Sequence, residues 1–233
     1  QQIQATSRAF AAILADGSVV TWGGADRGGD SSAVQEQLRG VQQIQAAGGA
    51  FAAILEDGSV VTWGAADRGG DSSAVQEQLK GVQQIQATVG GAFAAILEDG
   101  SVVTWGHAFC GGDSSEVRDQ LRGVQQIQAT CEAFAAILAD GSVVTWGHAD
   151  FGGDSSAVRD QLRGVQKIQA SHYAFAAILA DGSIITWGDA NYGGVSSAVG
   201  DQLRGVHQIQ ATVGGPSSRL LHLDVLGAPR ALC

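Results

Sequence analysis

One stretch decides the fold of this chain: Asp57-Gly58-Ser59-Val60-Val61-Thr62-Trp63-Gly64. Close copies of it occur five times, and their tryptophans recur at steps of 41 or 42 residues, at Trp22, Trp63, Trp105, Trp146 and Trp187. A fixed period in this range is typical of a propeller, a solenoid or another repeat array. Each copy is therefore interpreted as one structural unit among several similar ones.

Each repeat contains three short segments with the residue pattern of β-strands. In the second copy these segments cover residues 41–46, 50–55 and 59–63. The middle one, Ala-Phe-Ala-Ala-Ile-Leu, is apolar on both faces, because successive side chains of a strand point to opposite sides. A sheet with two apolar faces has to be covered on both of them. Since burying one Phe or Leu contributes about 1.5–3 kcal/mol, we expect the sheets to stack on one another.

The connections between the segments carry recognisable turn signals. Asp57-Gly58 lies between two β-prone runs and predicts a two-residue type I′ hairpin, in which both central residues need a positive φ. Further on, Ser73 and Gln76 resemble a capping box, and Gly81 stands where a helix would end. This pattern predicts a short helical turn between units, with an irregular outer connection as the alternative.

The order of these elements favours a β-propeller over a solenoid, because a meander with a tight hairpin suits propeller blades. The motif of the first strand occurs six times, at Ile3, Ile44, Ile85, Ile127, Ile168 and Ile209, but only five hairpins are present. We therefore predict an all-β propeller of five repeats plus a partial sixth, with an incomplete or open ring. A closed five-bladed ring and completion by a partner are the alternatives.

A single domain is expected, because the repeats run almost from end to end. Residues 1–215 form the repeat propeller, and residues 216–233 form a divergent tail or a partial blade, with one strand within 219–226. The chain opens in the middle of a repeat and contains no methionine, which indicates a piece of a longer precursor. No signal peptide is visible, and an intracellular location is favoured.

Three stretches resemble a known repeat. The Asp-Gly-Ser-Val-Val-Thr-Trp-Gly copies, Asn191-Tyr192-Gly193-Gly194 and Gly-Val-Gln-Gln-Ile-Gln-Ala resemble the regulator-of-chromosome-condensation repeat. The short period is similar to that of a compact variant of this family, the bacterial β-lactamase inhibitor propeller. The resemblance covers residues 1 to about 215 and implies a β-propeller that binds proteins. Members of this family usually close with more blades than the five hairpins present here.

The charge balance excludes some classes of function. The chain has 23 acidic and 13 basic residues and a net charge of −10, which argues against nucleic-acid binding, since that needs clustered Lys and Arg. No apolar run reaches the length of about 18 residues that a membrane span needs. Three cysteines, an odd number, do not form a disulfide scaffold.

The candidate binding residues lie where the repeats differ most. In a meander the loops after the first and third strands emerge at the same end, whereas the Asp-Gly turns emerge at the other. Loops on a rigid scaffold often carry recognition, and aromatic residues and Arg are typical anchors. The predicted partner-binding residues are Arg27, Arg68, His107, Phe109, Asp150, Phe151, His172, Tyr173, Asn191 and Tyr192. Their expected neighbours are Arg8, Cys110, Cys131, Glu132, His148 and Asp189. The alternative is sequence drift at unconstrained loop tips.

No motif indicates catalysis. The recurring Asp-Ser pairs, such as Asp71-Ser72, are interpreted as structural, and no nucleophile elbow, phosphate loop or His-Glu-x-x-His pattern is present. Convergence of His107, Cys110, Cys131, His148 and His172 could give a zinc site, and Cys110 and Cys131 could instead form a disulfide. Neither is favoured, so no enzyme activity, metal or cofactor is predicted.

The sequence therefore predicts a non-catalytic protein-interaction propeller that binds a partner through variable loops on one face. Two alternatives remain open. One is an accessory subunit permanently docked in a larger assembly, and the other is a fragment of a regulatory protein such as a large ubiquitin ligase or an exchange factor.

Overall fold

A computed structural model describes residues 2–211, and in this part of the chain the regular elements are strands and short 3-10 helices. The strands form five separate antiparallel sheets of three strands each, in the order in which they follow along the chain. We call these sheets blades 1 to 5. Blade 1 consists of β1 (Ile3–Ala5), β2 (Ala9–Ile13) and β3 (Val19–Gly23), and blade 2 of β4 (Val41–Ala46), β5 (Ala50–Leu55) and β6 (Val60–Gly64). Blade 3 consists of β7 (Val82–Ala87), β8 (Ala92–Leu97) and β9 (Val102–Gly106), blade 4 of β10 (Val124–Ala129), β11 (Ala133–Leu138) and β12 (Val143–Gly147), and blade 5 of β13 (Val165–Ala170), β14 (Ala174–Leu179) and β15 (Ile184–Gly188).

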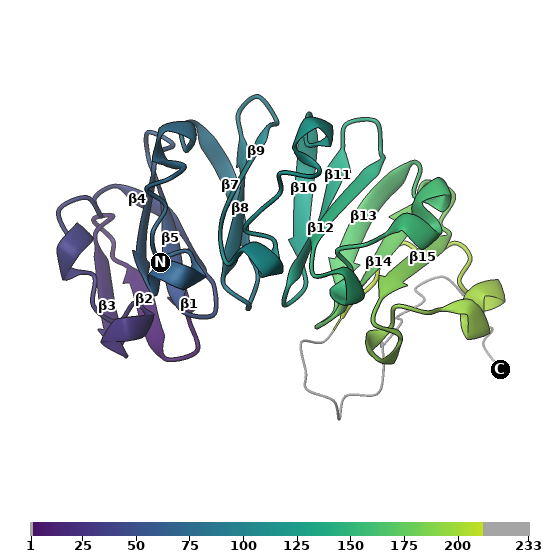
Figure 1. Cartoon of the computed structure of the whole chain (residues 1–233), viewed down its shortest axis with the longest axis horizontal. Helices are drawn as coiled ribbons and strands as arrows, with labels where there is room; N and C mark the ends of the chain where they lie inside the picture. Colours follow the sequence, from purple (N-terminus) through teal and green to yellow (C-terminus); the bar gives the residue numbers. More distant parts are fainter. Residues whose placement is uncertain (1, 212–233) are drawn as a thin grey trace, which may run out of the picture.

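The blades stand side by side in a fan, with blade 1 at one end and blade 5 at the other (Figure 1). The first strands of neighbouring blades contact one another in series, from β1 through β4, β7 and β10 to β13, which puts them on the inner side of the fan. The prediction of an all-β propeller is confirmed, and the five blades do not close into a ring within residues 2–211. The partial sixth repeat is also present, because Leu203, Val206 and Ile209 are buried against blade 5.

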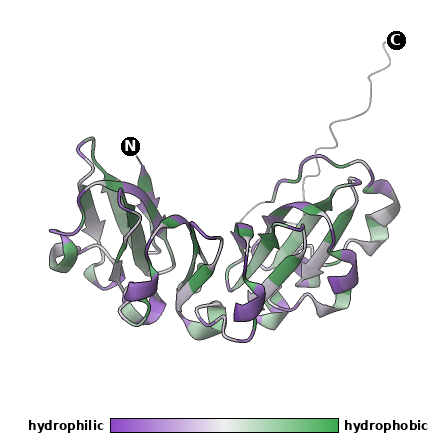
Figure 2. Cartoon of the chain, turned by 90° about the horizontal axis from the view of Figure 1, so that it is seen from above, coloured by the Kyte–Doolittle hydropathy of each residue, from purple (hydrophilic) through white to green (hydrophobic). Residues whose placement is uncertain are grey.

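The strands carry most of the apolar residues (Figure 2), and the blades pack through one repeated aromatic contact. In blade 3, Phe93 stacks on Trp105 with ring centroids 5.1 Å apart, and both side chains are buried. The indole nitrogen of Trp105 donates a hydrogen bond to the Gly69 carbonyl of the preceding blade, at 3.1 Å. A Cβ atom on Gly69 would lie 2.5 Å from the Phe93 ring, so only glycine fits there. Trp63, Trp146 and Trp187 make the same bond at the other blade junctions.

The hairpin turns differ from the expected type. Leu55 donates its N–H to the Ser59 carbonyl at 2.9 Å, and Gly58 donates to Leu55 at 3.0 Å, which makes a three-residue loop. Gly58 has a φ of 75°, and no residue other than glycine has a positive φ among those described. The prediction of a two-residue type I′ turn is therefore wrong, because the Asp does not take the left-handed conformation. Asp57 instead accepts hydrogen bonds from the N–H and hydroxyl of Ser59, at 2.9 and 2.6 Å.

The predicted helical turns between blades are present as 3-10 helices: η2 (Ser32–Val34), η4 (Gln76–Gln78), η6 (Arg118–Gln120), η8 (Ser156–Gln161) and η10 (Ser197–Gln202). The capping-box interpretation is wrong, because Gln76 donates to the Val60 carbonyl at 3.0 Å and accepts from the Ser72 hydroxyl at 2.9 Å. A second series of turns, which the sequence did not predict, follows each third strand: η1 (Ala25–Arg27), η3 (Ala66–Arg68), η5 (Ala108–Cys110), η7 (Ala149–Phe151) and η9 (Ala190–Tyr192).

The expected domain boundary at 215/216 and the expected strand within 219–226 lie outside the described residues. Between residues 2 and 211, no helix has both the length and the apolar character that a bilayer crossing needs.

Candidate protein-interaction face

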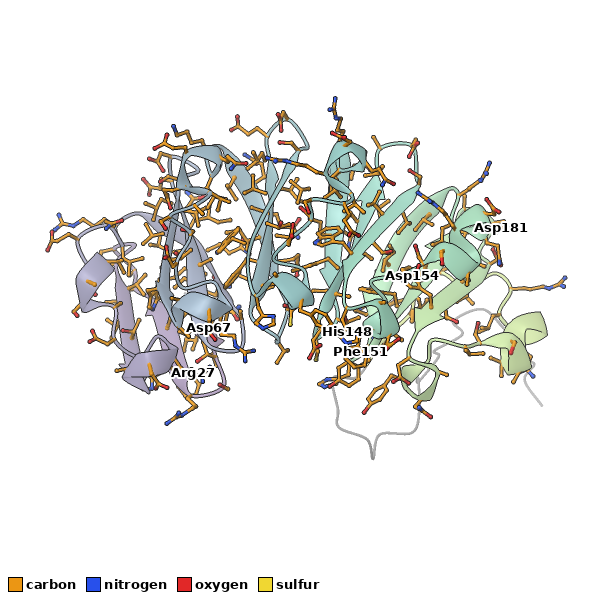
Figure 3. The ribbon with its side chains drawn as sticks, in the orientation of Figure 1. Arg27, Asp67, His148, Phe151, Asp154 and Asp181 are labelled. Carbon is orange, nitrogen blue, oxygen red and sulfur yellow. The ribbon has the colours of Figure 1, made fainter. Side chains whose placement is uncertain are left out.

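Two series of loops lie together at one rim of the fan, which we call the loop rim. In each blade the loop after the first strand accepts a backbone hydrogen bond from the loop after the third strand. Ala65 donates to Gly49 at 2.9 Å, and the same bond joins His148 to Glu132 and Asp189 to Tyr173. Figure 3 shows Arg27, Asp67, His148 and Phe151 along this rim, whereas Asp181 of a hairpin turn lies on the opposite side.

Six aromatic rings form a continuous row along the loop rim of blades 3 to 5. We call this row the aromatic ridge; it consists of Phe109, His148, Phe151, His172, Tyr173 and Tyr192. Phe109 meets His148 edge to face at 4.9 Å between ring centroids, and His148 stacks on Phe151 at 4.3 Å. Phe151 stacks on Tyr173 of the next blade at 4.1 Å, and Tyr173 meets Tyr192 at 4.8 Å.

Hydrogen bonds within the blades hold the backbone of the ridge. The Thr130 hydroxyl donates to the Phe151 carbonyl at 3.1 Å, and the Ser171 hydroxyl donates to the Tyr192 carbonyl at 2.8 Å. Phe109 is 66% exposed, so one end of the ridge is open to solvent. Burial raises the pKa of the Tyr173 hydroxyl, which therefore stays protonated at neutral pH and can donate a hydrogen bond.

The two predicted arginines lie on the other half of the loop rim and contact the protein itself. Arg68 donates to the Gly90 carbonyl of the next blade at 2.7 Å, and its guanidinium lies 3.7 Å from the Asp67 carboxylate. The Arg27 guanidinium lies 3.4 Å from the Asp26 carboxylate. Arg27 also packs over Gly49 of the next blade. Both side chains therefore link neighbouring blades, as Phe151 does in blade 4.

The remaining predicted residues are not part of the aromatic ridge. Asp150 and Asn191 are exposed at the helical turns of blades 4 and 5. Asn191 donates its backbone N–H to the Asp189 carboxylate at 2.7 Å, which fixes the turn and leaves the amide side chain in solvent. His107 is half-buried at the start of η5, and its Nδ1 atom is buried without a hydrogen-bond partner among the described residues.

The thiols at this rim are buried and have low reactivity. Cys110 and Cys131 are free cysteines, and Cys131 Sγ lies 3.2 Å from His172 Nδ1. Burial, together with the Glu132 carboxylate, raises the pKa of the Cys131 thiol to about 11, so it is protonated and a poor nucleophile at neutral pH. No group of three or more metal-ligating side chains is found between residues 2 and 211.

A groove of about 540 Å³ lies beside the exposed end of the ridge, between blades 3 and 4. Phe109 and Trp146 give it apolar walls, and Asp113, Glu116 and Asp154 give it acidic ones. Asp154 also accepts the Ser156 N–H at 2.8 Å, so the Asp-Ser pairs stabilise turns. The arrangement can hold a chain that carries apolar and basic side chains.

Sequence reasoning missed one surface. The outer face of blade 1 exposes Ile3, Phe10, Val20 and Trp22, although the same positions are core residues in blades 2 to 4. The repeat pattern gives no signal for this difference, because the residues themselves are the same in each copy. Only their position at one end of the fan distinguishes them.

Comparison with solved structures shows the fold of RCC1-like β-propellers. The chain is similar to Prp20p from Saccharomyces cerevisiae, described together with its binding properties to Gsp1p and histones, with 17% identity and a TM-score of 0.53 over 80% of this chain and 57% of that one. It is also similar to yeast RCC1 (Prp20) in a complex with Kap60, with 17% identity and a TM-score of 0.54 over 84% of this chain and 58% of that one. The chain thus spans less than two thirds of the length of these propellers. No protein-family model and no curated protein sequence matches it.

Proposed function

We propose that this chain is a protein-interaction propeller that binds its partner through the loop rim, with the aromatic ridge as the anchor. The observation that carries the proposal is the unbroken row of ring contacts from Phe109 to Tyr192. The blade fold does not require these rings, because blades 1 and 2 have Asp and Arg at the corresponding positions of their helical turns.

The chemistry of the ridge supports this role. Tyr and Phe side chains are frequent anchors at interfaces because they bury a large area with few rotatable bonds. The ridge is also held rigid by its own stacking, which reduces the entropy that binding would otherwise cost. The acidic groove beside Phe109 favours a partner segment with Lys or Arg next to an apolar residue.

The structural neighbours are consistent with a binding role without identifying the partner. Yeast Prp20p is described with binding properties to Gsp1p and histones, and a complex with Kap60 has been solved. Those proteins share only 17% identity with this chain, so we carry over the general use of such a propeller as a protein-binding scaffold and no named partner.

The test is quantitative capture from an extract of the native source with three forms of the tagged protein. The first is the wild type, and the second carries Phe109→Ala, Phe151→Ala and Tyr192→Ala together. The third is a matched control on the turn rim, the side with the Asp-Gly hairpins, and carries Asp99→Ala, Asp140→Ala and Asp181→Ala. We expect the ridge variant to bind its partner at least about tenfold more weakly, because each interface anchor contributes about 1–2 kcal/mol or more.

Circular dichroism and thermal unfolding confirm that each variant is folded. Capture that is equal for wild type and ridge variant would contradict the proposal, as would a loss confined to the turn-rim control. A partner recovered in this way is then titrated against the purified forms to obtain dissociation constants.

A further inference from the structure

Two equivalent grooves lie between neighbouring blades. The first groove, between blades 3 and 4, has a volume of about 540 Å³, and the second groove, between blades 4 and 5, has a volume of about 430 Å³. Residues 113–117 and β12 line the first groove, whereas residues within 154–158 and the end of β15 line the second. The molecule therefore contains the same kind of groove twice, with different side chains in its walls.

The first groove departs from the repeat at two positions. Phe109 stands where the other four repeats have Asp or Asn, at positions 26, 67, 150 and 191. Glu116 stands where the other four repeats have Ala, at positions 33, 74, 157 and 198. Both side chains line this groove. The blade fold requires neither of them, because the other copies form the same three strands without them.

Phe109 supplies an aromatic ring that is open to solvent and yet held in place. Its side chain is 66% exposed, and its ring meets the His148 ring edge to face at 4.9 Å between centroids. An aromatic face attracts a cation placed over it, and in proteins the cation is more often that of arginine than that of lysine. The ring therefore offers one contact for a basic side chain.

Three carboxylates share the lining with this ring: Asp113 and Glu116 from blade 3, and Asp154 from blade 4. Asp113 accepts the Ser115 N–H at 2.9 Å, and Asp154 accepts the Ser156 N–H at 2.8 Å. These backbone bonds hold the pKa of both aspartates below the ordinary value, so both are ionised at neutral pH. The groove thus presents fixed negative charge from both of its walls.

The chain does not neutralise this charge with its own side chains. Among the residues that the structure describes, no Lys, Arg or His lines the groove, and no ion pair includes Asp113, Glu116 or Asp154. By contrast, the carboxylates of Asp67 and Asp119 lie 3.7 and 3.9 Å from an arginine nitrogen. A basic group from a partner would complement the charge of the groove.

The second groove shows that charge alone does not distinguish the first. It is also lined by three carboxylates, those of Asp150, Asp154 and Asp189. However, it has Ala157 in place of Glu116, and the ring in its lining, that of Trp187, is buried. The first groove differs because it combines carboxylates with an exposed aromatic ring.

We propose that the first groove binds an arginine side chain of the protein partner. This inference rests on the proposed function and identifies the chemistry of the partner segment. The planar guanidinium lies against the Phe109 ring and donates hydrogen bonds to the carboxylates of Glu116 and Asp154. A lysine ammonium is a compact charge that does not match a flat ring and two carboxylates equally well. The residue beside the arginine is apolar, because the aromatic ridge begins at Phe109.

The test uses three short fluorescent peptides and the purified full chain. The first peptide has one arginine between two leucines in a Gly-Ser background. The second has citrulline in place of arginine, which keeps the shape and removes the charge, and the third has lysine. Fluorescence anisotropy gives the dissociation constants up to millimolar protein. We expect the arginine peptide to bind about tenfold or more tightly than the citrulline peptide, and more tightly than the lysine peptide.

A groove variant with Phe109→Asp and Glu116→Ala gives the first groove the residues of the second. It leaves the net charge of the chain at −10, so a loss of binding cannot come from a change in overall charge. Each substitution copies the residue that blade 4 carries at the same position, so the variant is expected to fold, which circular dichroism checks. It should bind the arginine peptide no more tightly than the citrulline peptide.

Glu116→Ala by itself separates this inference from the proposed function, because Glu116 is not part of the aromatic ridge. Its matched control is Asp119→Ala, which removes the same charge three residues away and outside the groove lining. Glu116→Ala is expected to weaken both the arginine peptide and capture of the native partner about tenfold. Asp119→Ala is expected to leave both unchanged.

Arginine and citrulline peptides that bind the wild type equally, or not at all, would overturn the proposal. Equal losses for Glu116→Ala and Asp119→Ala would overturn it too, because they would show attraction to the acidic surface in general. A native partner that the ridge variant loses and Glu116→Ala retains would overturn the arginine site and leave the interaction propeller standing. Arginine-selective binding that Glu116→Ala abolishes, with capture unchanged in the ridge variant, would support the arginine site and contradict the proposed function.

Discussion

Blade 1 and blade 4 contain the same three-stranded sheet, yet their aromatic residues are in opposite surroundings. Phe134 and Trp146 are buried between blades 3 and 4, while Phe10 and Trp22 of blade 1 face solvent. The ring stacking is the same, with centroids 5.2 Å apart in blade 4 and 5.3 Å in blade 1. The geometry of the pair is therefore set within the blade, whereas its contribution to stability depends on the neighbour.

The largest expected difference is at the phenylalanine. Phe134→Ala should destabilise the fold by about 3–5 kcal/mol, because it removes a fully buried ring and leaves a cavity. Phe10→Ala should change the stability of the single chain by at most about 1 kcal/mol, because its ring is already partly in water. Urea unfolding of dilute protein measures both. Equal losses would show that blade 1 is covered in solution even at low concentration.

A smaller difference is expected at the tryptophan. Trp146→Phe removes the donor to the Gly111 carbonyl, at 3.0 Å in a buried site, and should cost about 1–3 kcal/mol since that carbonyl loses its partner. Trp22→Phe should stay within about 0.5 kcal/mol, as expected for a surface substitution. Thermal unfolding of the two variants side by side checks this order, and a larger loss at Trp22 would contradict it.

The smallest difference is expected at the hairpin aspartates, which are equivalent in both blades. Hydrogen bonds from the hydroxyl and the N–H of the serine two residues further on, Ser18 or Ser142, hold the pKa of Asp16 and Asp140 below the ordinary value of 3.8. The stability that these bonds provide is therefore present above pH 3.8 and is lost as the pH falls through the lower pKa of the folded state. Asp16→Asn and Asp140→Asn keep an acceptor oxygen that does not titrate.

Both asparagine variants should weaken the acid dependence of the unfolding temperature by the same small amount. Unfolding temperatures measured from neutral pH to below pH 3.8 test this. Unequal slopes for the two variants would show that the turns, like the aromatic pairs, depend on the position of their blade in the fan.

Some features could be predicted from the sequence because they are local. The alternation of Ala50–Leu55 predicts a strand that is covered on both faces, and the repeat spacing predicts copies of one unit. The turn was predicted wrongly at Asp57-Gly58, since the dipeptide alone does not distinguish a two-residue loop from a three-residue loop. In the second case Gly58 takes the positive φ and Asp57 uses its carboxylate to bind Ser59.

The candidate site was predictable in its location and not in its organisation. The meander places both loop series at one rim, and the residues that vary there follow directly from comparing the repeats. Arg68 bonds to the next blade, and Phe151 stacks on Tyr173 in a row with four other rings. Both contacts depend on the distances between blades. The partner-binding role of these residues remains a prediction.

The sequence by itself determined the blade: the strand pattern, the position of the turn, and the Phe and Trp that each copy offers to a neighbour. These features follow from the alternation of side chains along each strand and from the backbone preferences of the turn residues. Both act within one repeat of about 40 residues, so the local sequence is sufficient to predict them. Only the tertiary structure decided which copies of Phe and Trp are core and which are surface. The physical reason is that burial is a property of the neighbouring blade, and blade 1 has a neighbour on one side only among the residues that the structure describes.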